Sequence, residues 1–409
     1  MEIFRYKLSN GLRVIIHEDD STPMAAINIL YNVGSKFESP ERTGFAHLFE
    51  HLMFGGSKNI PDYDIPIQYA GGENNAFTNT DTTNFYCVAP QENIETLLWL
   101  ESDRMLQLKF SIKSLNTQKK VVIEEYKETC LSEPYGDVWN HLSPLAYDVH
   151  PYRWPVIGIS PDHIKKATLD EVKKFFYKFY RPNNAIIAIV GNVKSSEVLP
   201  LVEKWFGDIP KGDDIFDDYE QEPIQTQQKR NTVKGNAPID ALYMAFKMVN
   251  RLHPDYYATD LLTDVLCNGH SSRLYRRLLK EKRLVSSIDA YISGFIDTGL
   301  VIIEARPAEG ITLEAIESAI WEELELLKKE LIDDRELQKL KNKIESTLIF
   351  SEMGLTSKAI NLCFYEMLGD ANWINDEGER YQAVTTHDIL RLASTIFTEN
   401  QSSILYYRA

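Results

Sequence analysis

The segment Gly44–Gly56 contains the spacing H-x-x-E-H, formed by His47, Glu50 and His51. In a helix, His47 and His51 lie one turn apart on the same face, so both imidazoles can reach one metal ion. The carboxylate of Glu50 then lies beside that ion. Most other positions of the segment are apolar, which predicts a buried helix. Buried imidazoles and a buried carboxylate are unfavourable unless they are paired or bind a metal.

Both ends of this helix are predicted from local signals. Ser39-Pro40-Glu41 is typical of an N-cap, a proline at the first helical position and an acid in the first turn. Gly55-Gly56 is typical of a helix end. A structural alternative remains open at this point: two core histidines hydrogen-bonded to backbone, with Glu50 as their ion partner.

A catalytic zinc site needs three protein ligands, so the metal hypothesis depends on a third residue. The stretch from Ser114 to Cys130 has helical periodicity. One stripe of that helix contains Gln118, Val121, Val122, Glu125 and Thr129. The stripe favours Glu125 as the ligand and leaves the adjacent Glu124 nearer solvent, although either acid can be an ordinary surface residue.

Composition narrows the class of protein. A chain of 409 residues is too long for one core and predicts two domains of about 200 residues each. The net charge of −16 argues against nucleic acid and anionic membrane surfaces as partners, and no apolar run is long enough for a membrane span. The four cysteines are widely spaced and predict small buried residues in a reducing compartment. We therefore expect the cytoplasm, or the periplasm if a signal segment has been removed.

These motifs together resemble the pitrilysin/insulinase metallopeptidases, the inverted H-x-x-E-H zinc enzymes. The segment Gly71–Thr78 is similar to the family's G-G-x-x-N-A-x-T. Further similar segments in the first half are Asn10-Gly11-Leu12, His150-Pro151-Tyr152, Arg181-Pro182-Asn183-Asn184-Ala185 and Val190-Gly191-Asn192. The combination is far more specific than H-x-x-E-H alone.

The resemblance implies a zinc endopeptidase with one zinc per chain, held by His47, His51 and Glu125. It implies that Glu50 is the general base. It also implies that substrate adds as a β-strand to an edge strand through Asn75 and Ala76, which recognises backbone and gives broad specificity. Where the family often has a second supporting glutamate, this chain has Gln118, which can orient a ligand but adds no charge.

The second half of the chain resembles a degenerate copy of the first. An irregular acidic stretch predicts a linker over 213–228, between a zinc-binding domain over 1–212 and a metal-free domain over 229–409. Thr168–Ala188 aligns without a gap with Thr386–Tyr406. The counterpart of the metal helix has Asp260, Thr263 and Asp264 at the metal positions, so we expect no zinc there.

A segment of the second half, Ser271–Ser287, is similar to a family motif whose arginine and tyrosine can contact substrate. Lys280 and Ser287 stand at those two positions. Lysine keeps the charge without the planar fork, and serine lacks the reach of a phenol. Either the segment is a drifted surface helix and turn, or this chain is the zinc-bearing subunit of a two-chain enzyme. The expected partner is therefore a second copy or a homologous chain that lacks the zinc motif.

The predicted fold class is α+β, with two homologous sandwich-like domains of mostly antiparallel sheet and helices on one face. The resemblance implies two chains around a chamber, which limits substrates to peptides or unfolded segments. The alternative function is a non-catalytic structural or binding subunit that retains the fold. A nucleotide-dependent enzyme and a serine or cysteine hydrolase are unsupported, because the sequence has none of their motifs.

Overall fold

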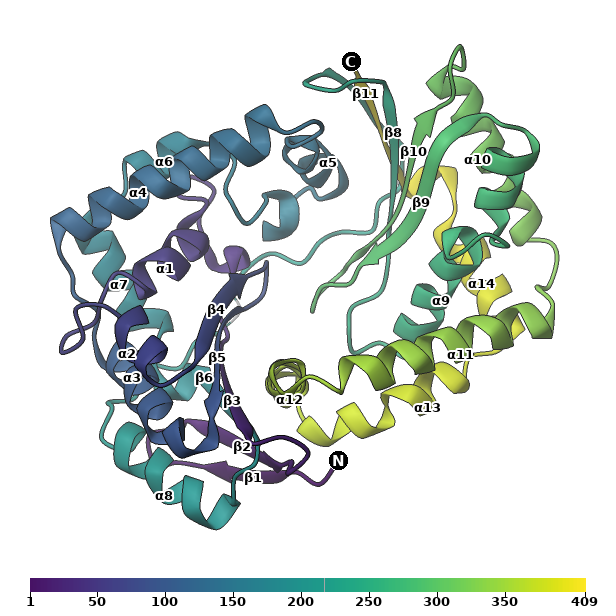
Figure 1. The fold of residues 1–409 in the computed structure, drawn as a ribbon. Coiled ribbons are helices and arrows are strands. Elements are labelled where there is room, and N and C mark those ends of the chain that lie inside the picture. Colours follow the sequence, from purple (N-terminus) through teal and green to yellow (C-terminus); the bar gives the residue numbers. More distant parts are fainter. Residues whose placement is uncertain (217) are drawn as a thin grey trace. The chain divides into compact units, whose positions relative to one another are not determined.

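A computed structural model describes residues 1–216 and 218–409 (Figure 1). The chain forms two compact units, and each contains three segments of sequence. Unit 1 consists of Met1–Tyr126, Pro155–Tyr219 and Ile349–Asp376, and unit 2 of Lys127–Trp154, Glu220–Leu348 and Glu377–Ala409. The described part of the predicted linker 213–228 has no helix or strand, and its Asp217 lies outside the described residues.

Unit 1 is built on a six-stranded sheet with the order β1-β2-β6-β3-β5-β4. All neighbouring pairs are antiparallel except β2 and β6, which are parallel. The strands are β1 (Phe4–Lys7), β2 (Arg13–Glu18), β3 (Met24–Tyr31), β4 (Glu73–Thr78), β5 (Thr83–Pro90) and β6 (Ala185–Gly191). Strand β4 therefore lies at an edge and has one paired side.

One face of this sheet is covered by the main helices of unit 1, and Ile187 and Ile189 of β6 point into that core. The unit 1 helices from the first half of the sequence are α1 (Phe45–Met53), α2 (Asp64–Tyr69), α3 (Ile94–Leu106), α4 (Ile112–Tyr126), α6 (Pro161–Lys165), α7 (Leu169–Phe179) and α8 (Ser195–Phe206). Their apolar side chains share one cluster with the strands, so α1 is anchored in a large core.

The opposite face of the unit 1 sheet is covered by a helix from the second half of the sequence. Helix α12 (Leu355–Leu368) lies against β3 and β6 (Figure 1). Its Leu362 and Cys363 are fully buried against Ile186 and Ala188 of β6. The Cys363 thiol also contacts the carbonyl oxygens of Asn28 and Ile186. Unit 1 is therefore completed by residues that follow most of unit 2 in sequence.

Unit 2 repeats this plan with a five-stranded sheet in the order β7-β11-β8-β10-β9. The strands are β7 (Lys229–Lys234), β8 (Ala241–Lys247), β9 (Val285–Ser293), β10 (Leu300–Pro307) and β11 (Ser402–Arg408). Only β7 and β11 are parallel, as β2 and β6 are in unit 1. The helices are α9 (Tyr256–Cys267), α10 (Leu313–Leu327), α11 (Asp334–Ser351), α13 (Glu377–Gln382) and α14 (Thr386–Ile396).

The other face of the unit 2 sheet is covered by α5 (Val138–Ala146), which comes from the first half of the sequence. Leu142 of α5 is buried with Tyr243 of β8 and Ile302 of β10. Each half of the sequence thus supplies one helix to the unit built mainly from the other half. The predicted domains were continuous, over 1–212 and 229–409. The compact units of the structure instead each combine segments from both ranges.

The internal repeat is present, but its predicted register is wrong by one residue. Thr168 caps α7 with a capping box, and the equivalent cap of α14 is Thr385, not Thr386. The next helix ends follow the same shift, since Tyr180 and Phe397 are the corresponding C-caps. Both registers match apolar residues with one another, and only the capping-box acids, Glu171 and Asp388, favour the observed one.

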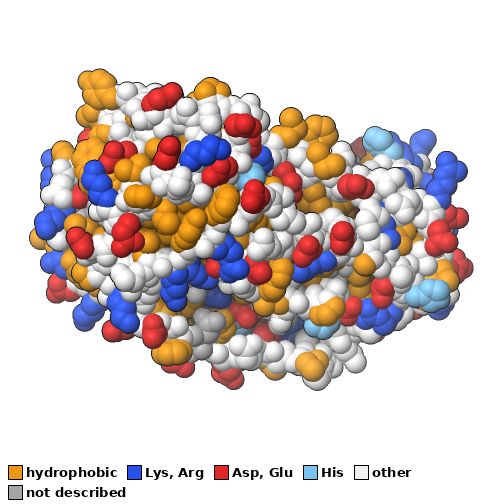
Figure 2. All heavy atoms as spheres, turned by 90° about the horizontal axis from the view of Figure 1, so that it is seen from below, with side chains coloured by type: hydrophobic (Ala, Val, Ile, Leu, Met, Phe, Trp, Pro, Cys, Tyr) orange, Lys and Arg blue, Asp and Glu red, His pale blue; other side chains and the backbone are white. Residues whose placement is uncertain are grey.

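The α+β class with two domains of mostly antiparallel sheet is confirmed. The expectation of helices on one face is incomplete, because α12 and α5 cover the second faces. All four cysteines are free and buried, as predicted. Among the described residues, no helix is long and apolar enough to cross a membrane. Figure 2 shows acidic and basic side chains interspersed over the face it displays.

The packing of α12 predicts that Leu362→Ala loosens the unit 1 sheet. Removing this fully buried side chain leaves a cavity and should cost about 2–5 kcal/mol. Hydrogen exchange resolved along the sequence should show faster exchange in β3 and β6. Ser357→Ala, an exposed change on the same helix, is the control. Unchanged exchange in β3 and β6 with Leu362→Ala would contradict the assignment of α12 to unit 1.

Candidate metal centre

Helix α1 begins later than the sequence predicts. Its first residue is Phe45, and its N-cap is Gly44 in a left-handed conformation (φ 84°), so the predicted start at Ser39-Pro40-Glu41 is wrong. The buried carboxylate of Glu38 takes over the capping role. It accepts hydrogen bonds from the backbone N–H groups of Gly44 (2.9 Å) and Ala46 (2.7 Å). Its oxygens thereby satisfy two of the backbone donors that the start of the helix leaves unpaired.

Burial raises the pKa of Glu38 to about 8, although the backbone N–H donors act in the opposite direction. The end of α1 is as predicted, because the helix stops at Met53 just before Gly55 and Gly56. Helix α1 is thus short, and its N-terminal end is capped by a side chain from outside the helix, that of Glu38.

The two faces of α1 differ in character. Leu48 and Phe49 are fully buried, and the Phe49 ring stacks on Tyr180 with centroids 5.4 Å apart. His47 and His51 lie on the other face, where their side chains are 13% and 23% exposed. The apolar face fixes the helix in the core, so the two imidazoles are presented from a rigid element.

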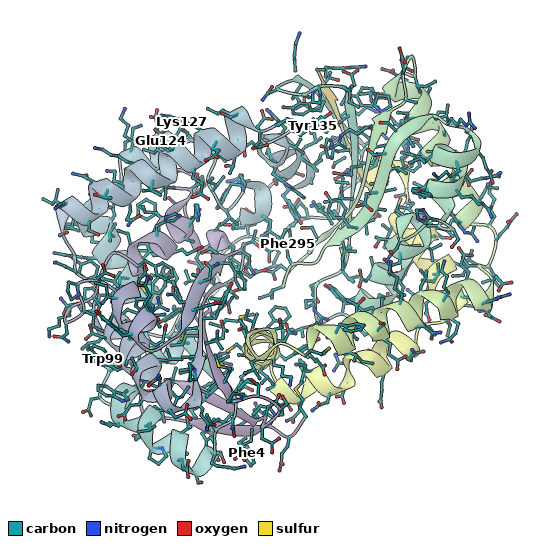
Figure 3. The ribbon with its side chains drawn as sticks, viewed as in Figure 1. Phe4, Trp99, Glu124, Lys127, Tyr135 and Phe295 are labelled. Atoms are coloured by element: carbon teal, nitrogen blue, oxygen red, sulfur yellow. The ribbon has the colours of Figure 1, made fainter. Side chains whose placement is uncertain are left out.

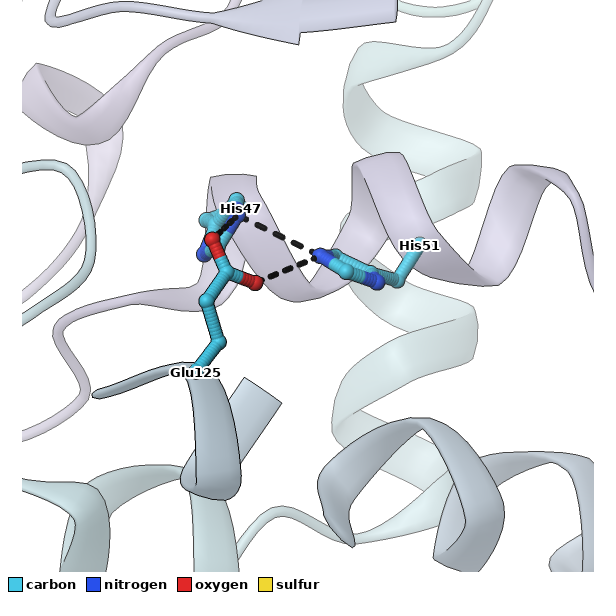
Figure 4. Close-up of side chains that lie close together, drawn as sticks. All are labelled: His47, His51 and Glu125. Atoms are coloured by element: carbon cyan, nitrogen blue, oxygen red, sulfur yellow. Dashed lines mark hydrogen bonds and ion pairs between the residues drawn. The ribbon is translucent and has the colours of Figure 1, made fainter. Parts of the chain in front are cut away.

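Helix α4 brings the third candidate ligand to this face, as Figure 4 shows. The Glu125 carboxylate lies 3.5 Å from His47 Nε2 through Oε1 and 3.2 Å from His51 Nε2 through Oε2. The two Nε2 atoms are 3.3 Å apart. Ligand atoms of His47, His51 and Glu125 all lie within 4.8 Å of one another, and this is the one such group found among the described residues.

These separations fit a zinc ion. Two atoms bound at about 2.0–2.1 Å to one tetrahedral ion lie about 3.3 Å apart. Two imidazoles and one carboxylate are also a donor set of catalytic zinc sites, and they leave a fourth position open. The structural alternative fits less well: within the described part of the chain, neither imidazole bonds to backbone, and His47 Nδ1 is buried without a hydrogen-bond partner.

The pKa shifts of His47 and Glu125 also suit a metal. Burial lowers the pKa of His47, which favours the neutral imidazole that binds cations. The hydrogen bond between His51 and Glu125 lowers the pKa of Glu125, although burial acts in the opposite direction. The lowered pKa favours the carboxylate. A neutral His47 and an ionised Glu125 would therefore present a lone pair and a negative charge to a cation bound between the side chains.

Glu50 extends from the same helix and is held by strand β4. Its Oε2 accepts a hydrogen bond of 2.6 Å from the hydroxyl of Thr78. Burial raises the pKa of Glu50, although the hydrogen bond from Thr78 acts in the opposite direction. A carboxylate with a raised pKa beside a metal cluster can accept a proton.

The predicted substrate residues Asn75 and Ala76 lie on the edge strand β4, which contacts α1. Asn75 is exposed and Ala76 is half-buried. The backbone N–H of Ala76 donates to Oδ1 of Asn75 at 2.8 Å. A side chain therefore occupies a backbone donor of the edge, which a peptide strand could otherwise use.

The predicted stripe on α4 is only partly correct. Val121 is 44% exposed and Thr129 is also exposed, whereas Val122 is buried. The buried residues of the helix are Leu115, Val122 and Tyr126. Glu125 lies half-buried at the edge of this stripe, and Glu124 is exposed as predicted on the outer side of α4 (Figure 3). The choice of Glu125 over Glu124 thus agrees with the geometry.

The remaining predicted residues do not join the cluster through any described contact. Gln118 is half-buried on α4 and makes no hydrogen bond to His47, His51 or Glu125 within the described residues. Lys280 and Ser287 belong to unit 2 and are exposed. Lys280 lies in a π-helical segment with its ammonium 5.3 Å from the Tyr275 ring centroid, and Ser287 lies on the edge strand β9.

The counterpart of α1 in unit 2 is organised without a metal cluster among the described residues. Asp260 accepts a hydrogen bond of 2.6 Å from the Tyr381 hydroxyl, and Asp264 accepts one of 2.6 Å from Asn268.

The sequence analysis missed two residues that contact the α1 helix of the candidate metal site. Thr78 stood in a quoted motif without a role, and no local signal identifies Glu38.

Comparisons with known proteins agree with this geometry. The family model described as "Insulinase (Peptidase family M16)" matches residues 13–158, and the model described as "Peptidase M16 inactive domain" matches residues 166–344. The chain is 30% identical over 407 residues to the zinc protease PqqE of Helicobacter pylori, covering 98% of this chain and 91% of that protein.

Two further matches extend the comparison. The crystal structure of a protease from Helicobacter pylori superimposes with a TM-score of 0.94 at 28% identity and covers all of both chains. The chain is also 24% identical to the mitochondrial-processing peptidase subunit beta of Saccharomyces cerevisiae, covering 86% of this chain and 79% of that protein.

The capping role of Glu38 predicts a specific pH dependence of stability. Its pKa is raised in the folded chain above the ordinary 4.5, so its contribution to stability is full below pH 4.5 and falls as the pH rises toward 8. Relative to Glu38→Gln, the native chain should lose up to about 1.4 kcal/mol of unfolding free energy per pH unit between these limits.

Denaturant unfolding at several pH values between 5 and 8 measures this difference. Glu41→Gln, an exposed acid nearby, is the control and should follow the native curve. Parallel curves for the native chain and Glu38→Gln would contradict the account of a buried carboxyl at the start of α1.

Proposed function

Because the chain belongs to the insulinase family of peptidases, peptidase family M16, we propose that it is a zinc-dependent endopeptidase. The observation that carries the proposal is the convergence of His47, His51 and Glu125 at separations suited to one tetrahedral ion. One zinc per chain would be held by these three residues. A bound zinc would supply a water that ionises near neutral pH and would polarise the scissile carbonyl.

The chain's own groups would supply positioning and proton transfer. Glu50, beside the cluster on α1, would accept a proton from the attacking water and then donate it to the leaving amine. The peptide would lie along the edge strand β4, with main-chain contacts at Ala76 and side-chain contacts from Asn75. Such recognition reads the backbone, so peptides and unfolded segments of varied sequence are the proposed substrates.

We propose a second chain as partner, either another copy or a homologue without the zinc motif. The support is the presence of Lys280 and Ser287 at the two positions where the family motif that this segment resembles has an arginine and a tyrosine. A relative named as a subunit of a processing peptidase is consistent with a two-chain arrangement. The proposed location is the cytoplasm, with the periplasm as the alternative. A non-catalytic subunit that keeps the fold is the second candidate function, and the intact ligand set argues against it.

The proposed roles predict that Glu50→Gln separates metal binding from catalysis. This variant should keep one zinc per chain and lose about 100- to 10,000-fold in kcat, because only proton transfer is removed. Glu125→Gln should lower the zinc content instead. The readouts are metal analysis and cleavage of an unstructured quenched-fluorescent peptide.

Glu124→Gln is the matched control, because Glu124 is the adjacent exposed acid on the same helix. It should retain both zinc and activity. Full peptidase activity in Glu50→Gln, or zinc loss in Glu124→Gln with retention in Glu125→Gln, would contradict the assigned roles.

The partner hypothesis predicts a gain of activity from Lys280→Arg combined with Ser287→Tyr. The guanidinium fork and the phenol would restore two substrate contacts, and kcat/KM of the purified chain should rise about tenfold. The control pair is Lys282→Arg with Ser286→Tyr, which makes the same chemical changes at exposed neighbouring positions. Equal activity of both double variants and the native chain would favour a drifted surface segment.

A further inference from the structure

Thr78 connects the edge strand to the proposed base. It is the last residue of β4, and its hydroxyl donates to Oε2 of Glu50 at 2.6 Å. The strand therefore holds the Glu50 carboxylate through this hydroxyl, and the bond has the short length of a charge-assisted interaction.

The same strand contains the proposed substrate contacts. Side chains alternate along a strand, so Ala76 and Thr78 lie on one face of β4, and Ala76 packs against the unit 1 core. Strand β4 contacts α1, which carries Glu50. The position of the edge strand and the position of the carboxylate are consequently joined by a direct contact.

We propose that Thr78 is a positioning residue that sets the Glu50 carboxylate at a fixed place relative to a peptide bound along β4. The inference rests on the proposed function. The contact with Thr78 engages Oε2 and leaves Oε1, which has no hydrogen-bond partner among the described residues, for the water. The base and the bound backbone then keep one spacing through the reaction.

The physical reason lies in the freedom of a glutamate side chain. Glutamate has three rotatable bonds, and a carboxylate on a helix without a partner samples several rotamers. The β-branched Thr78 side chain is itself restricted, so its hydroxyl is a fixed point of attachment. Holding the base in one orientation supports catalysis by removing unproductive arrangements before the reaction begins.

The test compares Thr78→Val, which keeps the shape of the side chain and removes the hydroxyl, with Thr78→Ser, which restores it. Loss of a hydrogen bond to a charged group predicts a fall in kcat of about 10- to 100-fold in Thr78→Val. Thr78→Ser should remain within about threefold of the native chain, and KM should change little in both. Thr232→Val, at an exposed strand position of unit 2, is the control and should behave as native.

A second readout does not depend on activity. Zinc content should be the same in all variants, and crystal structures of the zinc-loaded proteins should show Glu50 turned toward residue 78 in the native chain and Thr78→Ser. In Thr78→Val the carboxylate should adopt a different or a second orientation.

Several results would overturn the proposal. These are native kcat in Thr78→Val, a loss expressed only in KM, failure of serine to restore kcat, or an unchanged Glu50 orientation in Thr78→Val. If the zinc-loaded native chain cleaves no peptide, the proposed activity of the isolated chain fails, while the orientation of Glu50 still decides the role of Thr78.

Discussion

The contact between α1 and α4 is the interaction on which the site depends. It places one carboxylate across from two imidazoles, at separations of 3.2 and 3.5 Å, on helices whose other sides lie in an apolar core. Polar groups gathered in such a place are unfavourable unless something satisfies them. A bound cation would satisfy all three at once, and the apolar anchoring of α1 by Leu48 and Phe49 keeps the imidazoles in place for it.

The grouping of the three candidate ligands could be predicted from the sequence, because it depends largely on local periodicity. The spacing of His47 and His51 places both on one helix face, and the helical pattern around Glu125 distinguishes it from Glu124. The contacts that hold the site in place could not be predicted from the sequence. Glu38 caps α1 from outside the helix, and Thr78 reaches Glu50 from a strand, so both contacts arise only when distant segments pack. Local signals at Ser39-Pro40-Glu41 therefore predicted the wrong start.

The division into units shows a similar limit. Hairpins, the irregular stretch before β7 and the internal repeat could be recognised from residue patterns. Which helices cover the second face of each sheet could not be recognised in this way. Helices α5 and α12 have apolar faces that any buried surface could accept, and nothing local assigns α12 to β3 and β6. The one-residue error in the repeat has a different origin. Asp388 lies three residues after Thr385, as Glu171 does after Thr168, and the gapless comparison did not use this capping signal.

The measurement that tests the account most directly is anomalous X-ray diffraction from crystals of the zinc-loaded chain, recorded above and below the zinc absorption edge. The account predicts one strong anomalous peak per chain, about 2.0–2.2 Å from His47 Nε2, His51 Nε2 and a Glu125 oxygen, with Glu50 beside it and not bound to it. A peak elsewhere, a peak that includes Glu124 in place of Glu125, or no peak at full zinc saturation would contradict it.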